Sequence, residues 1–157
     1  MSETLHFRAA QPDEFEAFVG EAKATYAQDM VSNGGMSVAE ATAKAERDLA
    51  TTLPVALVTP GHTLLFILDA HGRRIGRLWF GEQPPAVYLY AIWLDESVRG
   101  RGLGRQAMQW LEHETRRRGF DRIELNVFGG NTTARRLYES LGYPEVAVSM
   151  RKDLSSH

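Results

Sequence analysis

The first third of the chain repeats its apolar residues every three or four positions, in two separate stretches. This spacing predicts two amphipathic helices. The first begins at Pro12-Asp13-Glu14, with proline and acids in its first turn, and ends at Asn33-Gly34-Gly35. The second begins at Ser37, and Glu40 three residues later completes a capping box. Two helices are therefore expected before the main sheet.

Shorter apolar runs bounded by turn residues predict strands before and after these helices. The predicted strands are Leu5–Ala9, Thr63–Asp69, Arg74–Phe80, Ala86–Asp95, Asp121–Phe128 and Val146–Met150. Two further helices, Leu103–Arg118 and Asn131–Leu141, separate the last three strands. The order β-α-α-β-β-β-α-β-α-β predicts a mixed α/β fold around one sheet, in a single domain of residues 1–157.

Composition narrows the class of protein. Hydrophobic residues make up 43% of the chain and charged residues 24%, as in ordinary globular proteins. Because the chain has no cysteine, disulfides, thiolate metal sites and a cysteine nucleophile are excluded. No apolar run approaches the ~20 residues of a membrane span, and residues 1–10 lack the hydrophobic segment of a signal peptide. We therefore expect a cytoplasmic protein with no membrane partner.

The charged residues are unevenly distributed. The net charge is −2, but residues 11–52 carry eight acids and three bases. The rest of the chain is positive, and six arginines lie between Arg99 and Arg118. A nucleic-acid-binding protein would be basic overall, with a continuous basic patch. Positive charge gathered around one turn and one helix end instead favours a phosphorylated small molecule.

That turn, Arg99 to Gly104, lies between the predicted strand Ala86–Asp95 and the helix that follows it. Backbone N–H groups at a helix start are unpaired and lie at the positive end of the helix dipole. The glycines allow close approach, and Arg99, Arg101 and Arg105 add charge, so the turn predicts a phosphate or pyrophosphate site. It lacks the Lys-Ser/Thr pair of a P-loop and the spacing of a dinucleotide fold.

Two motifs together carry a resemblance to a known family. Residues 99–104 read Arg-x-x-Gly-x-Gly, and residues 123–143 read IELNVFGGNTTARRLYESLGY. The second stretch fits the pattern N-x-x-A-x-x-L-Y-x-x-x-G-[FY] residue for residue. Both resemble the GNAT N-acetyltransferase superfamily, and the chain is most similar to uncharacterised bacterial members. The resemblance covers residues 64–150.

The resemblance implies a GNAT (acyl-CoA N-acyltransferase) fold, whose mixed central sheet has splayed central strands. The pantetheine arm of acetyl-CoA would lie between those strands, bonding backbone groups around Ile92 and Leu94. Asn131 would hold the cofactor arm, and Tyr138 would contact the thioester sulfur as the general acid for the departing thiolate. No metal is implied. The pyrophosphate would be bound by Arg99, Gly100, Arg101, Gly102, Leu103 and Gly104.

Residue patterns alone leave other roles open. Tyr138 is flanked by apolar residues at helical spacing and could be only a packed side chain. Asn131 suits a helix N-cap. Arg101 and Arg105 could contact phosphate or water. The run Arg116–Arg118 is expected to be a solvated helix end.

The general base is not identified by the sequence. Some relatives carry a glutamate where this chain has Ala86, and others carry one at Asn126. Glu124 lies on the same strand face as Asn126 and could act through a water molecule. The other candidates are Tyr88, Tyr90, His62 and a water chain with no single base.

The predicted reaction is acetyl transfer from acetyl-CoA to a primary amine by direct attack in a ternary complex. The acidic segment 11–52 leads to the hypothesis of a cationic small-molecule acceptor, although these acids could simply be solvated helix faces. Two alternatives remain: a protein lysine or N-terminal acetyltransferase, and an acyl-CoA sensor without turnover. No nucleic-acid partner is expected, and a homodimer agrees with the family.

Overall fold

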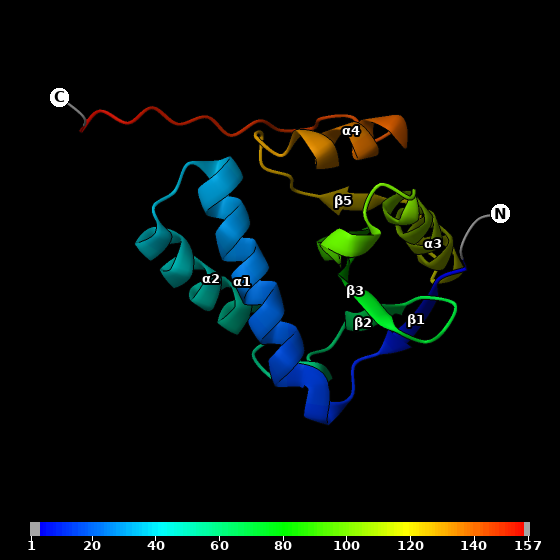
Figure 1. The fold of residues 1–157 in the computed structure, drawn as a ribbon. Helices are drawn as coiled ribbons and strands as arrows, with labels where there is room; N and C mark the ends of the chain where they lie inside the picture. The colour runs from blue at the N-terminus through cyan, green and yellow to red at the C-terminus, as the bar shows by residue number, and fades with distance from the viewer. Residues whose placement is uncertain (1–3, 156–157) are drawn as a thin grey trace.

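The computed structural model describes residues 4–155 (Figure 1). Three short 3-10 turns, Pro12–Glu14, Ala56–Val58 and Glu96–Val98, join the main elements. The strands are β1 (His6–Ala9), β2 (His62–Leu68), β3 (Arg74–Gln83), β4 (Ala86–Leu94) and β5 (Ile123–Leu125), and the helices are α1 (Phe15–Gly34), α2 (Val38–Thr52), α3 (Leu103–Arg117) and α4 (Thr132–Ser140).

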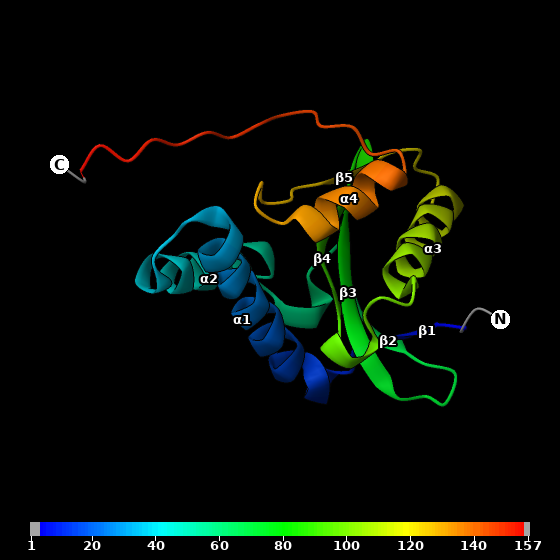
Figure 2. The same ribbon diagram turned by 45° about the horizontal axis from the view of Figure 1, so that its top comes forward.

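The strands form one sheet in the order β1-β2-β3-β4-β5. The first four are antiparallel, and β5 joins β4 in parallel. Helices α1 and α2 lie on one side of the sheet, whereas α3 and α4 lie on the other (Figures 1 and 2). This confirms the predicted mixed α/β fold around one sheet.

Each face of the sheet buries its own apolar cluster. On the α3 side, Leu78 and Phe80 pack with Leu111. On the α1 side, Phe66 packs against Phe18 with the two rings edge to face. Strand β3 is therefore buried on both faces, which explains why its apolar residues Leu78, Trp79 and Phe80 are consecutive rather than alternate.

Local signals in the sequence determine where the helices begin and end. The Ser37 hydroxyl accepts a hydrogen bond from the backbone N–H of Glu40, so Ser37 is the N-cap of α2. The Glu40 carboxylate accepts from the Ser37 hydroxyl rather than from its backbone N–H, so the second bond of the predicted capping box is not formed. Gly35 follows α1 in the left-handed conformation, with φ of 69°, and its N–H bonds back to Met30. Both predicted helix boundaries are confirmed.

The end of α3 differs from the prediction of a solvated arginine run. Arg117 and Arg118 both donate to Glu114, at 2.7 and 2.8 Å, and Arg118 also reaches the Thr63 hydroxyl. These hydrogen bonds hold the pKa of the Glu114 carboxyl near 2. The predicted solvated end holds for Arg116 and Arg117, which are exposed, and is wrong for Arg118, which is partly buried between Glu114 and Thr63.

The predicted strand Val146–Met150 is also wrong, and β5 is shorter than the predicted Asp121–Phe128. Residues 144–155 are exposed and form no ladder with any described strand. They run in an extended path past the end of α1, where Arg151 donates to the Gly34 carbonyl at 2.7 Å (Figure 1). Alternating hydrophobicity specifies a strand only when a partner edge is within reach.

Candidate active site

The sheet splits between β4 and β5. Their parallel ladder covers only Val87, Tyr88 and Leu89 of β4. Immediately beyond lies a β-bulge, because Leu89 pairs with Phe80 while Ala91 pairs with Trp79, leaving Tyr90 as the extra residue. The last part of β4 therefore keeps β3 on one side and has no strand on the other among the described residues.

The free edge of β4 presents backbone groups to this gap. Asp95 donates its N–H to the Ile75 carbonyl on the β3 side. Because backbone groups alternate along a strand, those of Ile92 and Leu94 point away from β3. The Leu94 carbonyl accepts a hydrogen bond from Arg99 Nε at 2.9 Å. The N–H and C=O of Ile92 and the N–H of Leu94 thus face the gap, where an extended ligand could pair with them.

The glycine turn stands where this edge ends. Gly100 and Gly102 have φ of 81° and 76°, and Gly102 is the N-cap of α3 without a side-chain cap. The first N–H groups of α3 therefore face outward at the positive end of the helix dipole. The side chain of Leu103 is buried, so this residue can contribute only its backbone. Arg101 lies exposed on the same turn.

The two neighbouring arginines are held by other groups. Arg99 bonds to Leu94, and its guanidinium lies 5.7 Å from the centre of the Trp93 ring. Arg105 donates to the Ser140 hydroxyl of α4. Gly104 lets the two helices approach, because a Cβ there would already lie 3.4 Å from Leu137.

Tyr138 lies in α4 and is 9% exposed, with its ring edge-on to Tyr143. No described residue forms a hydrogen bond with its hydroxyl. Burial, and to a smaller degree the Asp29 carboxylate, raises the pKa of Tyr138 to about 12. Asp29 belongs to α1, on the opposite side of the sheet. The phenol is thus buried, protonated and free to donate.

Asn131 caps α4, since its Oδ1 accepts the Ala134 N–H at 3.1 Å. The capping role that the sequence left open is therefore present. Its side-chain amide nitrogen still has donors to offer, so capping leaves the predicted cofactor contact available.

The candidates for the general base differ in whether they have a free acceptor atom that could take a proton from the amine. The ring nitrogen Nδ1 of His62 accepts the Trp79 indole N–H at 3.0 Å, and burial lowers its pKa. Its other ring nitrogen then carries the proton, so His62 cannot accept another. Tyr88 receives a hydrogen bond from Asn126 at 2.7 Å, and burial raises its pKa. Glu124 is exposed and pairs directly opposite Tyr88.

The wall on the α1 side is aromatic and acidic. Tyr88 and Tyr90 meet edge to face, with ring centres 4.8 Å apart. Tyr26 of α1 donates to Asp48 at 2.7 Å, and Asp29 accepts from Asn33 at 2.6 Å. The sequence reading missed Tyr26 and Asp29 as site residues, although their spacing of three places them on one helix face.

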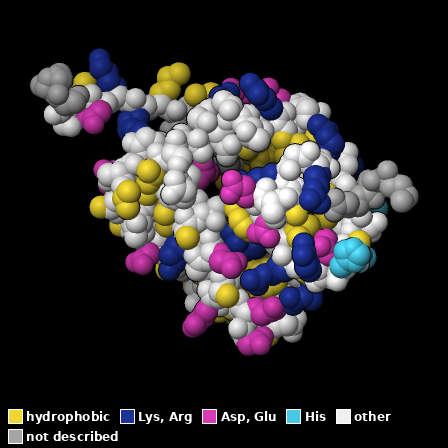
Figure 3. All heavy atoms as spheres, in the orientation of Figure 1, with side chains coloured by type: hydrophobic (Ala, Val, Ile, Leu, Met, Phe, Trp, Pro, Cys, Tyr) yellow, Lys and Arg dark blue, Asp and Glu magenta, His cyan; other side chains and the backbone are white. Residues whose placement is uncertain are grey.

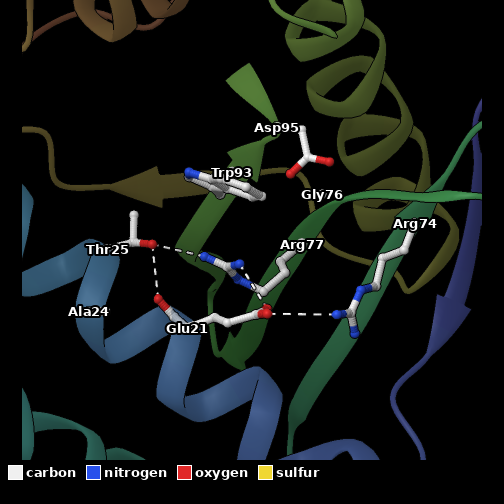
Figure 4. A pocket seen from close by; sticks show the side chains of 8 residues that line it. All are labelled: Glu21, Ala24, Thr25, Arg74, Gly76, Arg77, Trp93 and Asp95. Atoms are coloured by element: carbon white, nitrogen blue, oxygen red, sulfur yellow. Dashed lines mark hydrogen bonds and ion pairs between the residues drawn. The ribbon is translucent and has the colours of Figure 1, made fainter. Parts of the chain in front are cut away.

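A pocket lies on the same side, near the end of β4 (Figure 4). It encloses about 360 Å³ and is lined by Glu21, Ala24, Thr25, Arg74, Gly76, Arg77, Trp93 and Asp95. The buried guanidinium of Arg77 lies 4.6 Å from the Trp93 ring centre and donates to Glu21 and Thr25. Since Arg99 contacts the same indole, this network links α1 to the glycine turn.

A model of the acetyltransferase (GNAT) family matches residues 35–143, more than half of the chain. The chain belongs to this family. YdgE of Bacillus subtilis, an uncharacterised N-acetyltransferase, is 33% identical over 146 residues, which are 90% of this chain and 93% of YdgE. The crystal structure of YycN from Bacillus subtilis superposes with a TM-score of 0.88 at 31% identity, covering 96% of this chain and 99% of YycN.

Membership of the GNAT family makes the protein an acetyl-CoA-dependent acetyltransferase. A structure from Clostridium acetobutylicum that contains acetyl-CoA shares the fold, with a TM-score of 0.60 at 16% identity, covering 98% of this chain and 99% of that one. The free edge of β4 and the uncapped start of α3 fit such a co-substrate. Between residues 4 and 155, no cluster of three metal-ligating side chains is found, and no helix is long and apolar enough to cross a membrane.

The glycine turn generates a prediction for acetyl-CoA binding. Replacing Arg99 by Met removes a charge that Leu94 and Trp93 hold beside the start of α3. We expect the Kd for acetyl-CoA to rise about tenfold, the loss of one charge-assisted contact. Arg116→Met at the exposed far end of α3 is the matched control and should leave the Kd unchanged. Titration calorimetry measures both, and equal effects of the two changes would contradict the assignment.

Proposed function

We propose that this protein transfers the acetyl group of acetyl-CoA to the primary amine of a small cationic acceptor, by direct attack within a ternary complex. The observation that carries the proposal is the unpaired edge of β4, which ends beside the uncapped start of α3, together with the buried phenol of Tyr138 on α4. Asp29 on α1 is the acid of the proposed acceptor side. Because acetyl-CoA is an intracellular metabolite, the proposed location is the cytoplasm.

In this proposal acetyl-CoA lies along β4, and the acceptor amine enters from the α1 side of the gap. The pantetheine arm pairs with Ile92 and Leu94, its pyrophosphate lies on residues 99–104, and Asn131 contacts the arm. The amine attacks the thioester carbon from the α1 side. As the C–S bond breaks, the thiolate takes the phenolic proton of Tyr138. Burial keeps the phenol of Tyr138 protonated at neutral pH, as a proton donor must be.

The attacking amine must also lose a proton. We propose Glu124 as the base, acting through water, because it is exposed and lies opposite Tyr88 at the mouth of the gap. His62 is not proposed, since its accepting nitrogen is occupied.

Charge and aromatic surface support a cationic acceptor. Asp29 and Glu124 form no ion pair with any described residue, whereas Asp48 is already paired with Lys44 at 2.9 Å. The faces of Tyr88 and Tyr90 can attract a cation. Most of the other acids of segment 11–52 lie on exposed helix faces, so Asp29 carries the hypothesis. The proposed acceptor is a polyamine, an amino sugar or another small amine.

Tyr138→Phe tests the acid and separates an enzyme from a sensor. Loss of the proton donor should lower kcat about 100-fold, with the Kd for acetyl-CoA nearly unchanged. Because the pKa of Tyr138 is about 12, deprotonation of this residue should not reduce the wild-type kcat until the pH approaches 12. Release of the coenzyme A thiol measures kcat for the wild type and the variant at each pH. A fall in wild-type kcat centred well below pH 12 and absent from Tyr138→Phe would contradict the account, and a sensor would show no turnover.

Asp29→Asn tests the acceptor class. Removing this charge should raise the KM for a cationic acceptor about fivefold and leave the KM for acetyl-CoA unchanged, and added salt should weaken acceptor binding to the wild type more than to the variant. Asp13→Asn, in the 3-10 turn that precedes α1, is the control. An acceptor KM that changes neither with added salt nor on Asp29→Asn would contradict a role for charge in acceptor binding.

A further inference from the structure

The pocket beside the end of β4 lies on the α1 side of the sheet, next to the gap proposed for acetyl-CoA. It encloses about 360 Å³, the size of a small-molecule site. In Figure 3, acidic and basic side chains lie next to one another on the face where α1 meets the sheet, with apolar atoms visible between them. Two arginines and two acids line the pocket itself, so its formal charge is zero.

One wall of the pocket carries more positive charge than its own acid neutralises. The guanidinium groups of Arg74 and Arg77 share the single carboxylate of Glu21, at 3.6 and 3.1 Å. Arg77 is buried, burial lowers its pKa, and its Nε has no hydrogen-bond partner within residues 4–155. Arg74 is exposed, lies 4.3 Å from the centre of the Phe66 ring and makes no side-chain hydrogen bond to another described residue. Its donors are therefore free, and the wall favours an anionic group such as a carboxylate.

The opposite wall carries an acid without a partner. Figure 4 shows Asp95, which follows β4, across the pocket from the guanidinium groups of Arg74 and Arg77. Its carboxylate is partly buried and forms no hydrogen bond or ion pair with a described residue. A partly buried acid of this kind favours a cationic group. The two walls together therefore suit a ligand that carries both charges close together, as the carboxylate and ammonium of an α-amino acid do.

The pocket adjoins the proposed acceptor side on both α1 and the sheet. Thr25, in the pocket lining, lies one helical turn before Asp29, about 6 Å along the same face of α1. On the sheet, Arg77 is two residues from Trp79, whose indole stacks on Tyr90 with ring centres 4.8 Å apart. A chain of four methylene groups also spans roughly 6 Å. A ligand held in the pocket by its charged head could thus present a side-chain amine to the acceptor side.

We propose that the acceptor is an α-amino acid whose side chain ends in a primary amine, with its α-carboxylate on Arg74 and its α-ammonium on Asp95. This inference rests on the proposed function and narrows its acceptor class. The side-chain amine passes Thr25 toward Asp29 and attacks the thioester. The C–N bond forms as the C–S bond breaks, the amine gives up one proton, and the departing thiolate takes one from Tyr138.

The buried arginine supports the carboxylate without contacting it. Two of the Arg77 nitrogens already donate to Glu21 and Thr25, and Nε is buried. Its positive charge adds to that of Arg74, and a bound carboxylate would in turn stabilise the buried cation. The exposed Arg74 is therefore the residue to replace in a test, because its loss leaves the buried network in place.

Matched amines test the pocket through release of the coenzyme A thiol. Lysine carries both charged groups, cadaverine is the same chain without the carboxylate, and Nα-acetyl-lysine lacks the α-ammonium charge. We expect kcat/KM for lysine to exceed that for either analogue about tenfold, the contribution of one charge-assisted contact. If cadaverine were acetylated as well as lysine, the pocket assignment would be overturned while the proposed function would stand.

Substitutions on the two walls should change these ratios separately. Arg74→Met should bring the ratio of kcat/KM for lysine and cadaverine close to one, and Asp95→Asn should do the same for lysine and Nα-acetyl-lysine. Arg73→Met is the matched control, because this neighbouring side chain is 80% exposed in the turn before β3, and it should keep the wild-type ratios. Ratios that stay unchanged in Arg74→Met and Asp95→Asn would contradict the assignment.

Titration calorimetry separates a failure of this inference from a failure of the proposed function. Lysine should bind to the wild type in the presence of coenzyme A, and about tenfold more weakly to Arg74→Met. Absence of lysine binding, or thiol release with other amines but not with lysine, would overturn the amino-acid acceptor alone. Absence of thiol release with every amine would contradict the proposed function, and the acceptor assignment with it.

Discussion

The site depends on a failure of strand pairing. Strand β4 pairs with β5 for three residues and then bulges at Tyr90, after which its outer edge has no neighbouring strand. Partly buried backbone groups that lack a partner cost free energy, so Ile92 and Leu94 favour a ligand or water that can pair with them. An extended amide-containing arm suits that need, and acetyl-CoA carries one. The start of α3 lies at the end of this edge, so the position of the anion site follows from that of the strand.

The gap also allows residues from opposite layers to contribute to the proposed site. Helices α1 and α4 lie on different sides of the sheet, and a continuous sheet would separate Asp29 from Tyr138. At the far end, Gly34 of α1 lies against Phe128, and a Cβ added at Gly130 would come within 3.1 Å of Asn33. These close contacts fix the end of α1 beside the segment between β5 and α4. The two sides of the proposed site are therefore joined by direct packing.

Local signals made much of this predictable from the sequence. The Ser37 cap, the Gly35 stop and the glycine turn before α3 depend on residues close together in the chain, and each formed as expected. The bulge at Tyr90 has no such signal, because it is set by the pairing of β4 with β3. His62 and Arg118 were misjudged for a related reason: their partners, Trp79 and Glu82, are distant in sequence. The predicted strand Val146–Met150 did not form because an alternating pattern does not specify a partner edge.

Hydrogen exchange at individual amides tests the central claim most directly. The amides of Ala91 and Trp93 face β3, so their exchange should be slow with or without acetyl-CoA. The amides of Ile92 and Leu94 face the gap, so their exchange should slow markedly when acetyl-CoA binds. Unchanged exchange at Ile92 and Leu94 in the saturated protein would contradict the account, because the free edge of β4 would then not be the place where the co-substrate lies.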